Sequence, residues 1–118
     1  MQKIQIFLDE HLDVRLKLLF DKTFLVFTAK DKKWQGKLNG ELLQLMIKNK
    51  INVFITNDKN LRYQQNTDKL DLIFIELNTI GNHYNITAPL IIEINKYLLS
   101  NKFRQEQKNK KAFYLIWK

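Results

Sequence analysis

The sequence predicts a three-layer α/β domain built around a mainly parallel sheet. Short apolar segments of strand length recur along the chain and alternate with amphipathic segments of helical period. Segments such as 24–28 (FLVFT) are continuously apolar, which is typical of parallel strands buried on both faces. The order strand, helix, strand, helix, strand, strand, helix supports the same interpretation.

The first half of the chain supplies three strands and two helices. Leucines at 12, 16 and 19 recur at helical spacing, and charged residues lie between them. The second helix places Leu42, Leu43, Met46 and Ile47 on one face, and Asn39 is positioned to cap it. The predicted elements are a strand at 3–8, a helix at 11–20, a strand at 24–28, a polar loop at 29–38, a helix opened by Asn39, and a strand at 53–56.

The second half begins with a polar segment, 57–70, that is expected to contain one short helical turn. A fourth strand is predicted at 72–75 and a loop at 78–86, which contains Gly81. Thr87 is expected to cap a helix begun by Ala88 and Pro89. The last predicted strand, 112–117, follows a basic segment. We therefore expect one domain, with residues 1–99 as its main body and a basic tail and strand at 100–118 as part of it.

Composition excludes several classes of protein. The chain has 118 residues and no cysteine, so disulfides, thiolate metal sites and cysteine nucleophiles are absent. No apolar run approaches the roughly 20 residues that a membrane-spanning helix needs. Acidic residues at 9 and 10 interrupt the segment where a signal peptide would be apolar. We therefore expect a cytoplasmic protein that does not enter a membrane.

The chain is strongly basic, with a formal net charge of +8. Such a charge favours polyanions, and nucleic acid is the leading candidate. A composition rich in Lys, Asn and Ile is an equally weighted explanation. Five basic residues lie between 102 and 111 against one acid, so this tail is either a phosphate-contacting segment or a solvated tether.

Acidic residues follow two of the predicted strands. Asp9 and Glu10 come directly after the first strand, and Asp58 follows the third. Glu41 lies in the first turn of the helix before the third strand, and right-handed crossovers place that turn at the same edge. Ligands of open α/β sheets bind at this edge, and carboxylates there suit Mg²⁺ or Mn²⁺. We therefore predict a cation site.

Each of these acids also has a structural explanation. Asp9 or Glu10 could cap the following helix, Asp58 could cap the next turn, and Glu41 is favourable at a helix start. Other side chains carry weaker signals. His11 and His83 are expected at the surface, Trp34 and Tyr63 are expected to pack rather than to stack on bases, and Glu76 is expected to be an exposed strand-end residue.

Three segments resemble a known family. LDEHL at 8–12, WQGKLNGELL at 34–43 and TNDKNLRYQQN at 56–66 look like the small stand-alone PIN-like proteins, which are related to VapC-type toxin nucleases and the Mut7-C ribonuclease domain. The resemblance covers about residues 3–98. It implies a PIN-like fold and a Mg²⁺- or Mn²⁺-dependent endoribonuclease of the kind that toxin–antitoxin pairs contain. By this resemblance Asp9, Glu41 and Asp58 are the catalytic metal ligands and Glu10 supports them.

The sequence departs from the family pattern at two positions. Asn60 and Asn39 stand where acids are common, so a catalytically silent module that binds RNA or protein is one alternative. A phosphoacceptor receiver domain with Asp58 as acceptor is another. Receivers have a Lys-Pro pair after the fifth strand, whereas the single proline here is Pro89.

The expected partners are RNA, an antitoxin protein and a second copy of the chain. The second copy would pair through the apolar strand at 112–117, because an exposed strand edge can add a further strand. The residues predicted to contact nucleic acid are Lys59, Asn60, Arg62, Lys102 and Arg104.

Overall fold

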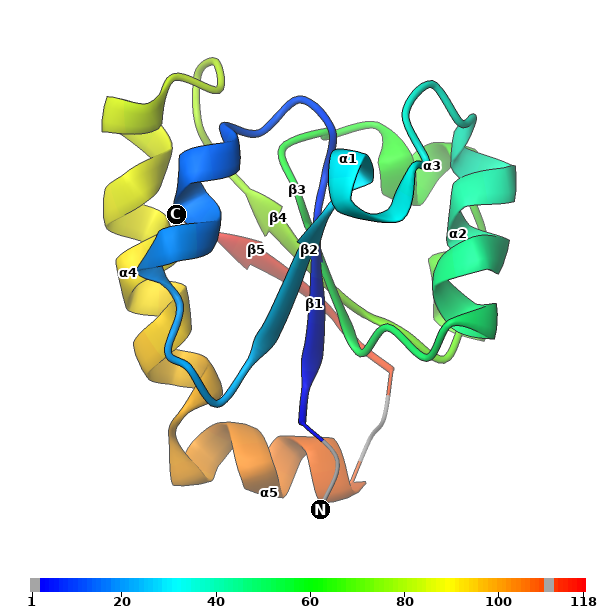
Figure 1. Ribbon diagram of the computed structural model, residues 1–118. Coiled ribbons are helices and arrows are strands. Elements are labelled where there is room, and N and C mark those ends of the chain that lie inside the picture. Colours follow the sequence, from blue (N-terminus) through cyan, green and yellow to red (C-terminus); the bar gives the residue numbers. More distant parts are fainter. Residues whose placement is uncertain (1–2, 110–111) are drawn as a thin grey trace.

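Five parallel strands form the centre of the protein in the computed structural model (Figure 1). The structure describes residues 3–109 and 112–118, without the side chains of Arg62 and Asp68. The order of the strands in the sheet is β2-β1-β3-β4-β5, and every described pair of neighbouring strands is parallel. The predicted α/β class is confirmed, and the sheet is parallel throughout. The strands are β1 (Gln5–Leu8), β2 (Leu25–Thr28), β3 (Val53–Thr56), β4 (Ile73–Leu77) and β5 (Tyr114–Trp117).

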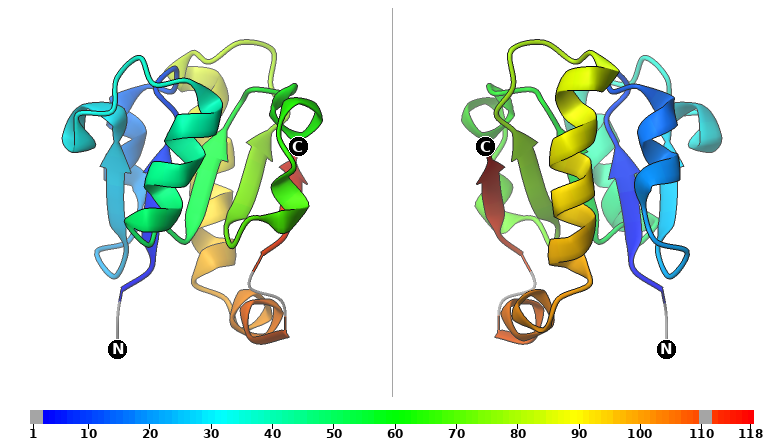
Figure 2. Two further views of the ribbon diagram at one scale, coloured as in Figure 1. Left: turned by 90° about the vertical axis from the view of Figure 1, so that its right-hand side faces the viewer. Right: turned by 90° about the vertical axis from the view of Figure 1, so that its left-hand side faces the viewer.

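Helical segments cover both faces of the sheet (Figure 2). One face carries η1 (Val14–Leu19), a 3₁₀-helix, and α4 (Tyr84–Leu98). The other carries α1 (Ala29–Lys32), α2 (Asn39–Lys48) and α3 (Leu61–Gln64), with the 3₁₀-turn η2 (Thr67–Lys69) before β4. Alternate strand residues point to opposite faces, so the chain buries two separate apolar clusters.

A row of aromatic rings crosses the second face. Phe7, Phe54, Phe74 and Tyr114 lie on four neighbouring strands, with successive ring centroids 5.9, 6.1 and 5.5 Å apart. The three phenylalanines are almost completely buried. Such pairs contribute about 0.5–1.5 kcal/mol each beyond their buried area. This row therefore fixes the register of the strands whose ends carry the predicted acids.

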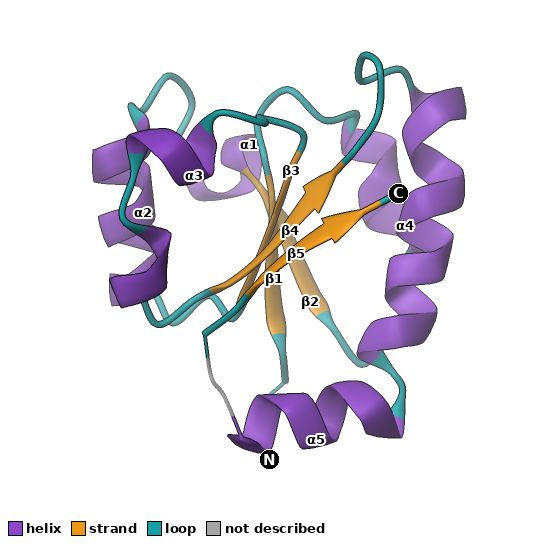
Figure 3. Ribbon diagram, turned by 180° about the vertical axis from the view of Figure 1, so that it is seen from behind, coloured by secondary structure: helices purple, strands orange, loops and turns teal. Residues whose placement is uncertain are grey.

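The connection from β4 to β5 has the opposite hand to the other crossovers. With the face that carries η1 and α4 toward the viewer and the strands pointing up, η1 leads rightward to β2 (Figure 2, right). From the same face, α4 leads leftward to β5. This crossover is left-handed, which is rare for parallel strands. It places α5 (Asn101–Asn109) across the edge where the strands begin (Figure 3).

Several predicted element boundaries were wrong. The helix expected at 11–20 is the shorter η1, because the Asp13 carboxylate accepts a hydrogen bond from the Arg15 N–H and starts the turn later. The predicted polar loop 29–38 contains α1, whose first turn is capped by a capping box between Thr28 and Asp31. The predicted basic tail is α5, anchored by the fully buried Phe103. Lys110 and Lys111 lie outside the described residues.

Two predicted caps are also corrected. Leu38, not Asn39, is the N-cap of α2, and Asn39 is its first residue. The last long helix begins at Tyr84, three residues before Thr87. The Thr87 hydroxyl donates to the His83 carbonyl oxygen (3.1 Å), so this threonine bonds back within the helix instead of capping it. No helix within the described residues is long and apolar enough to cross a membrane.

Candidate functional site

The predicted acids lie where the direction of strand succession reverses. The chain moves from β1 outward to β2 and then crosses back to β3, so β1 and β3 are neighbours whose following loops diverge. Ligands of doubly wound sheets bind at such a switch point. A cavity of about 200 Å³ opens there. Its lining comprises Phe7, Asp9, Glu10, His11, Ala29, Trp34, Lys37, Asn39, Leu42 and Asp58.

Asp9 is held firmly by the adjacent strand. Its backbone N–H donates to the Ile55 carbonyl oxygen (2.9 Å), which extends the β1–β3 ladder by one residue. Its Oδ1 accepts from the Glu10 N–H (2.7 Å), and its Oδ2 accepts from the Thr56 hydroxyl (2.6 Å). Each carboxylate oxygen keeps a second lone pair, so Asp9 remains able to ligate a cation.

Thr56 also connects Asp9 to Asp58. The Thr56 hydroxyl oxygen accepts from the Asp58 N–H (3.0 Å) while its proton is donated to Asp9. The Asp58 Oδ1 in turn accepts from the Asn60 N–H (3.0 Å), which forms an Asx-turn. Thr56 is fully buried at the end of β3. One buried hydroxyl therefore sets the spacing of two carboxylate-bearing loops.

Glu10 is held by the segment between α1 and α2. Its Oε1 accepts a hydrogen bond from the Gly36 N–H (2.8 Å). Gly36 has a φ of 75°, which side-chain-bearing residues adopt only at a cost. Trp34 anchors the same segment, because its buried ring packs 5.4 Å from that of Phe7. The prediction that Trp34 packs is confirmed, whereas Tyr63, for which packing was also predicted, is 74 % exposed.

Burial of the carboxyl group is the main cause that raises the pKa of Asp9 above its ordinary value. The nearby charge of Asp58 adds a smaller increase, whereas the Thr56 hydroxyl, the Glu10 N–H and His11 oppose it. The ionised form of Asp9 is therefore costly for the folded protein. A cation bound beside it would offset that cost.

Replacing Asp9 with asparagine should stabilise the metal-free protein at neutral pH, because it removes a charge whose burial is costly. Because the folded pKa is raised, ionisation of Asp9 costs stability above that pKa, and the cost disappears as pH falls through it toward the ordinary value. The stability difference between Asp9→Asn and the wild type should therefore shrink on acidification. Thermal melts from pH 4 to 7.5 without metal measure it, and a less stable variant at neutral pH would contradict the prediction.

Glu41 is at the predicted edge but outside the cavity lining. Its Oε1 forms an ion pair with the Lys37 Nζ (2.8 Å), one turn earlier, and its side chain is 57 % exposed. Within residues 3–109 and 112–118, no group of three His, Cys, Asp or Glu side chains is arranged to hold a metal ion. Asp9 and Asp58 remain together as oxygen donors, and they fit Mg²⁺, which commonly takes one or two carboxylates and completes its shell with water.

The residues predicted to contact nucleic acid are spread over both ends of the sheet, the end where the strands begin and the end where they finish. Lys59 is near the acids, but its Nζ donates to the Thr79 carbonyl oxygen (2.9 Å). The Asn60 N–H donates to the Asp58 carboxylate and so belongs to the turn after β3. The side chain of Arg62 lies outside the described part of the structure. Lys102 and Arg104 are on α5, at the opposite edge from the cavity (Figure 1). Contact of all five with one RNA segment near the acids is therefore not supported by their placement.

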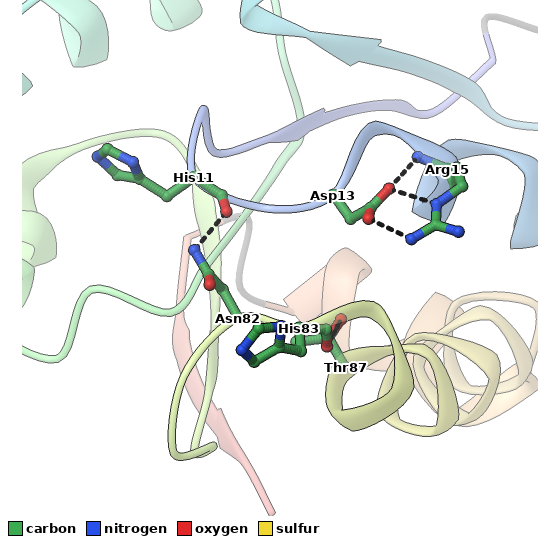
Figure 4. Close-up of polar contacts among 6 residues, drawn as sticks. All are labelled: His11, Asp13, Arg15, Asn82, His83 and Thr87. Atoms are coloured by element: carbon green, nitrogen blue, oxygen red, sulfur yellow. Dashed lines mark hydrogen bonds and ion pairs between the residues drawn. The ribbon is translucent and has the colours of Figure 1, made fainter.

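The two histidines do not form a shared site. The Asn82 side chain donates to the His11 carbonyl oxygen (2.6 Å), which ties the β1 loop to the loop before α4 (Figure 4). The His11 ring points away from Asn82, and His83 serves as the N-cap of α4 through its backbone. Both rings are at the surface, as predicted.

Sequence reasoning missed two polar residues and misplaced a third. Thr56 and Lys37 lie inside the quoted segments but were assigned no role, because only the pairing of β1 with β3 and the start of α2 bring them to the acids. Glu76 is buried, not exposed, and accepts a hydrogen bond from the Tyr114 hydroxyl (2.5 Å). The continuous apolar pattern of β4 was the available signal that its last residues are buried.

The fold and this edge define an α/β protein with a doubly wound parallel sheet and a small acidic cavity at the switch point. Comparisons of the chain with protein-family models, with curated proteins and with solved structures found no match.

Proposed function

We propose that the protein is a Mg²⁺- or Mn²⁺-dependent endoribonuclease whose metal site is built on Asp9 and Asp58. The observation that carries this proposal is that Asp9 and Asp58 line one cavity and are linked by one buried threonine hydroxyl. The raised pKa of Asp9 adds to it, because burial makes the ionised carboxylate costly and a bound cation would offset that cost.

The bound ion would polarise a phosphodiester and lower the pKa of a water molecule, as divalent cations do in other hydrolytic sites. The chain's own residues supply the positioning. Thr56 and the Glu10 N–H hold the Asp9 carboxylate, and the Asn60 N–H holds that of Asp58. Lys37 lines the cavity and could neutralise a phosphate oxygen, while the buried walls of Phe7 and Trp34 limit the access of water.

RNA is the proposed substrate for two reasons. The net charge of +8 favours a polyanion, and the three quoted segments resemble PIN-like ribonucleases. An antitoxin partner and a cytoplasmic location remain predictions from the sequence. The test is direct: purified protein should cleave a labelled RNA with Mn²⁺ and should stop when EDTA is added. Cleavage that continues in EDTA would contradict the metal-dependent mechanism, and binding of RNA without cleavage would favour the silent module.

Glu41 is expected to join the metal site by leaving Lys37. An exposed pair of this kind contributes under about 1 kcal/mol, so the carboxylate is readily released. Glu41→Gln should weaken Mn²⁺ binding about tenfold with little change in stability. Lys37→Gln should preserve or strengthen binding, because it frees Glu41. Calorimetric Mn²⁺ titration measures both, and unchanged affinity in Glu41→Gln would exclude Glu41 as a ligand.

A phosphoacceptor function is the second candidate. The strand order 2-1-3-4-5 is shared by doubly wound sheets of the flavodoxin and receiver type, and Asp58 follows β3. Treatment with acetyl phosphate followed by intact-mass measurement separates the candidates. A phosphate adduct that is lost in Asp58→Asn would favour the receiver, whereas an unmodified protein that cleaves RNA would favour the nuclease.

A further inference from the structure

A second and larger cavity lies far from the acidic edge. It is an open groove of about 590 Å³ between α4, α5 and β5. Tyr97 contributes from α4, Lys102 and Glu106 from α5, and Leu115 and Trp117 from β5. The Tyr97 and Trp117 rings lie 5.3 Å apart, so the groove has an aromatic wall. Its size is within the range of pockets that bind ligands or side chains.

Glu106 presents an unsatisfied acceptor at this groove. Its Oε2 accepts from the Tyr97 hydroxyl (3.2 Å), whereas its Oε1 is buried and has no hydrogen-bond partner among the described residues. Lys102 is one helical turn away and lines the same groove, yet no ion pair joins the two side chains within the described residues. A buried acceptor without a partner costs free energy that a donor from another molecule would recover.

The free edge of the sheet borders the same groove. β5 is the last strand in the sheet order. The carbonyl oxygens of Phe113 and Trp117 accept hydrogen bonds from the N–H of Phe74 in β4 (2.8 Å) and from that of Asn78 just after it (2.7 Å). Because backbone groups alternate in direction along a strand, the N–H and C=O of Ile116 point away from β4. Ile116 also lines the groove. A strand added at this edge would therefore pass beside Glu106.

We propose that this groove is the docking site for an extended segment of a partner protein, which adds to the free edge of β5 and places a lysine or arginine side chain against Glu106. Edge addition supplies main-chain hydrogen bonds, and the pocket supplies selectivity for the side chain. Because Oε1 is buried, the Glu106 side chain must turn to meet a cationic donor, and its last side-chain torsion is soft. The Tyr97 and Trp117 rings favour the same cationic group.

A second copy of this chain fits the groove less well. Two copies would each bring a net charge of +8, and the paired strand would offer Lys118 as its one basic residue between 112 and 118. The proposal therefore commits to a different protein. It is independent of the nuclease proposal, because the groove shares no lining residue with the acidic cavity.

The probe is a blocked seven-residue peptide of alternating threonine and valine with a central arginine. It is titrated into the ¹⁵N-labelled chain of 118 residues. The Ile116 amide and its neighbours in the groove should shift. The matched peptide with citrulline, which keeps the shape of arginine without its charge, should bind about tenfold more weakly. Equal binding of the two peptides, or shifts confined to residues outside the groove, would overturn the proposal.

Two variants test the groove itself. Glu106→Gln should weaken the arginine peptide about tenfold and abolish its advantage over citrulline. Glu93→Gln is the matched control, because it removes the same charge beside Trp117 but lies outside the groove lining. Ile116→Pro removes an outward N–H and should block addition while leaving the β4 ladder intact. Light scattering should show a monomer; a dimer that Ile116→Pro dissociates would instead assign the edge to a second copy.

Discussion

Replacing Asp58 with asparagine should reduce Mn²⁺-dependent RNA cleavage by about a thousandfold or more, because a metal ligand contributes several kcal/mol to stabilisation of the transition state. The substitution removes the charge and keeps the oxygen that accepts from the Asn60 N–H. The turn after β3 should therefore keep its conformation, and the loss should appear in the rate and not in stability. Single-turnover cleavage of labelled RNA measures the rate.

The matched control is Asp71→Asn. Asp71 is exposed and lies before β4, at the opposite edge of the sheet from the cavity. The Asp71→Asn substitution removes the same charge from the same kind of side chain. It therefore controls for the effect of net charge on the attraction of RNA to the protein. We expect it to cleave at the wild-type rate. Full activity in Asp58→Asn would rule out the proposed metal site, whatever the control shows.

Replacing Trp34 with alanine should lower the free energy of unfolding by about 3–5 kcal/mol, the usual range for deleting a buried aromatic side chain. Trp34 is 9 % exposed and packs on Phe7, which also lines the cavity. Without the ring, the segment carrying Gly36 loses its anchor, and Glu10 loses a fixed hydrogen-bond donor. Urea unfolding measures the stability, and Mn²⁺ titration reports the effect on the site.

Trp34→Phe is the control for this change. A smaller aromatic ring keeps much of the contact with Phe7, so we expect a loss of about 1 kcal/mol and nearly unchanged Mn²⁺ binding. A loss below 1 kcal/mol in Trp34→Ala would mean that the segment between α1 and α2 is held by its backbone bonds instead. The backbone hydrogen bond concerned is the one that the Trp34 N–H donates to the Ala29 carbonyl oxygen (2.9 Å).

Much of the fold could be predicted from local patterns. Continuous apolar segments identified all five strands within a few residues, because burial on both faces of a parallel sheet leaves no polar alternation. Helix boundaries were less predictable. Asp13 and Thr28 each start a turn through their own side chains, and such local bonds compete with the helical period. The reverse bond of Thr87 to His83 has the same origin.

The acidic edge was only partly predictable. The placement of Asp9 and Asp58 after two strands follows from the sequence, because parallel strands end at one edge. Their proximity depends on β1 and β3 being neighbours, which long-range pairing decides. The ion pair between Lys37 and Glu41 and the burial of Thr56 are further consequences of tertiary packing. Neither has a motif that single-sequence reasoning could have used.

The sequence alone therefore determined the class of fold, the strands and the edge at which the acids collect, since burial and chain direction are written in local residue patterns. Tertiary structure decided which loops meet, and it separated the basic helix α5 from the acidic cavity by the length of the sheet. It also decided the left-handed path to β5 and left one Glu106 carboxylate oxygen without a partner among the residues that the structure describes. These features depend on contacts between residues far apart in the chain, and no local pattern encodes them.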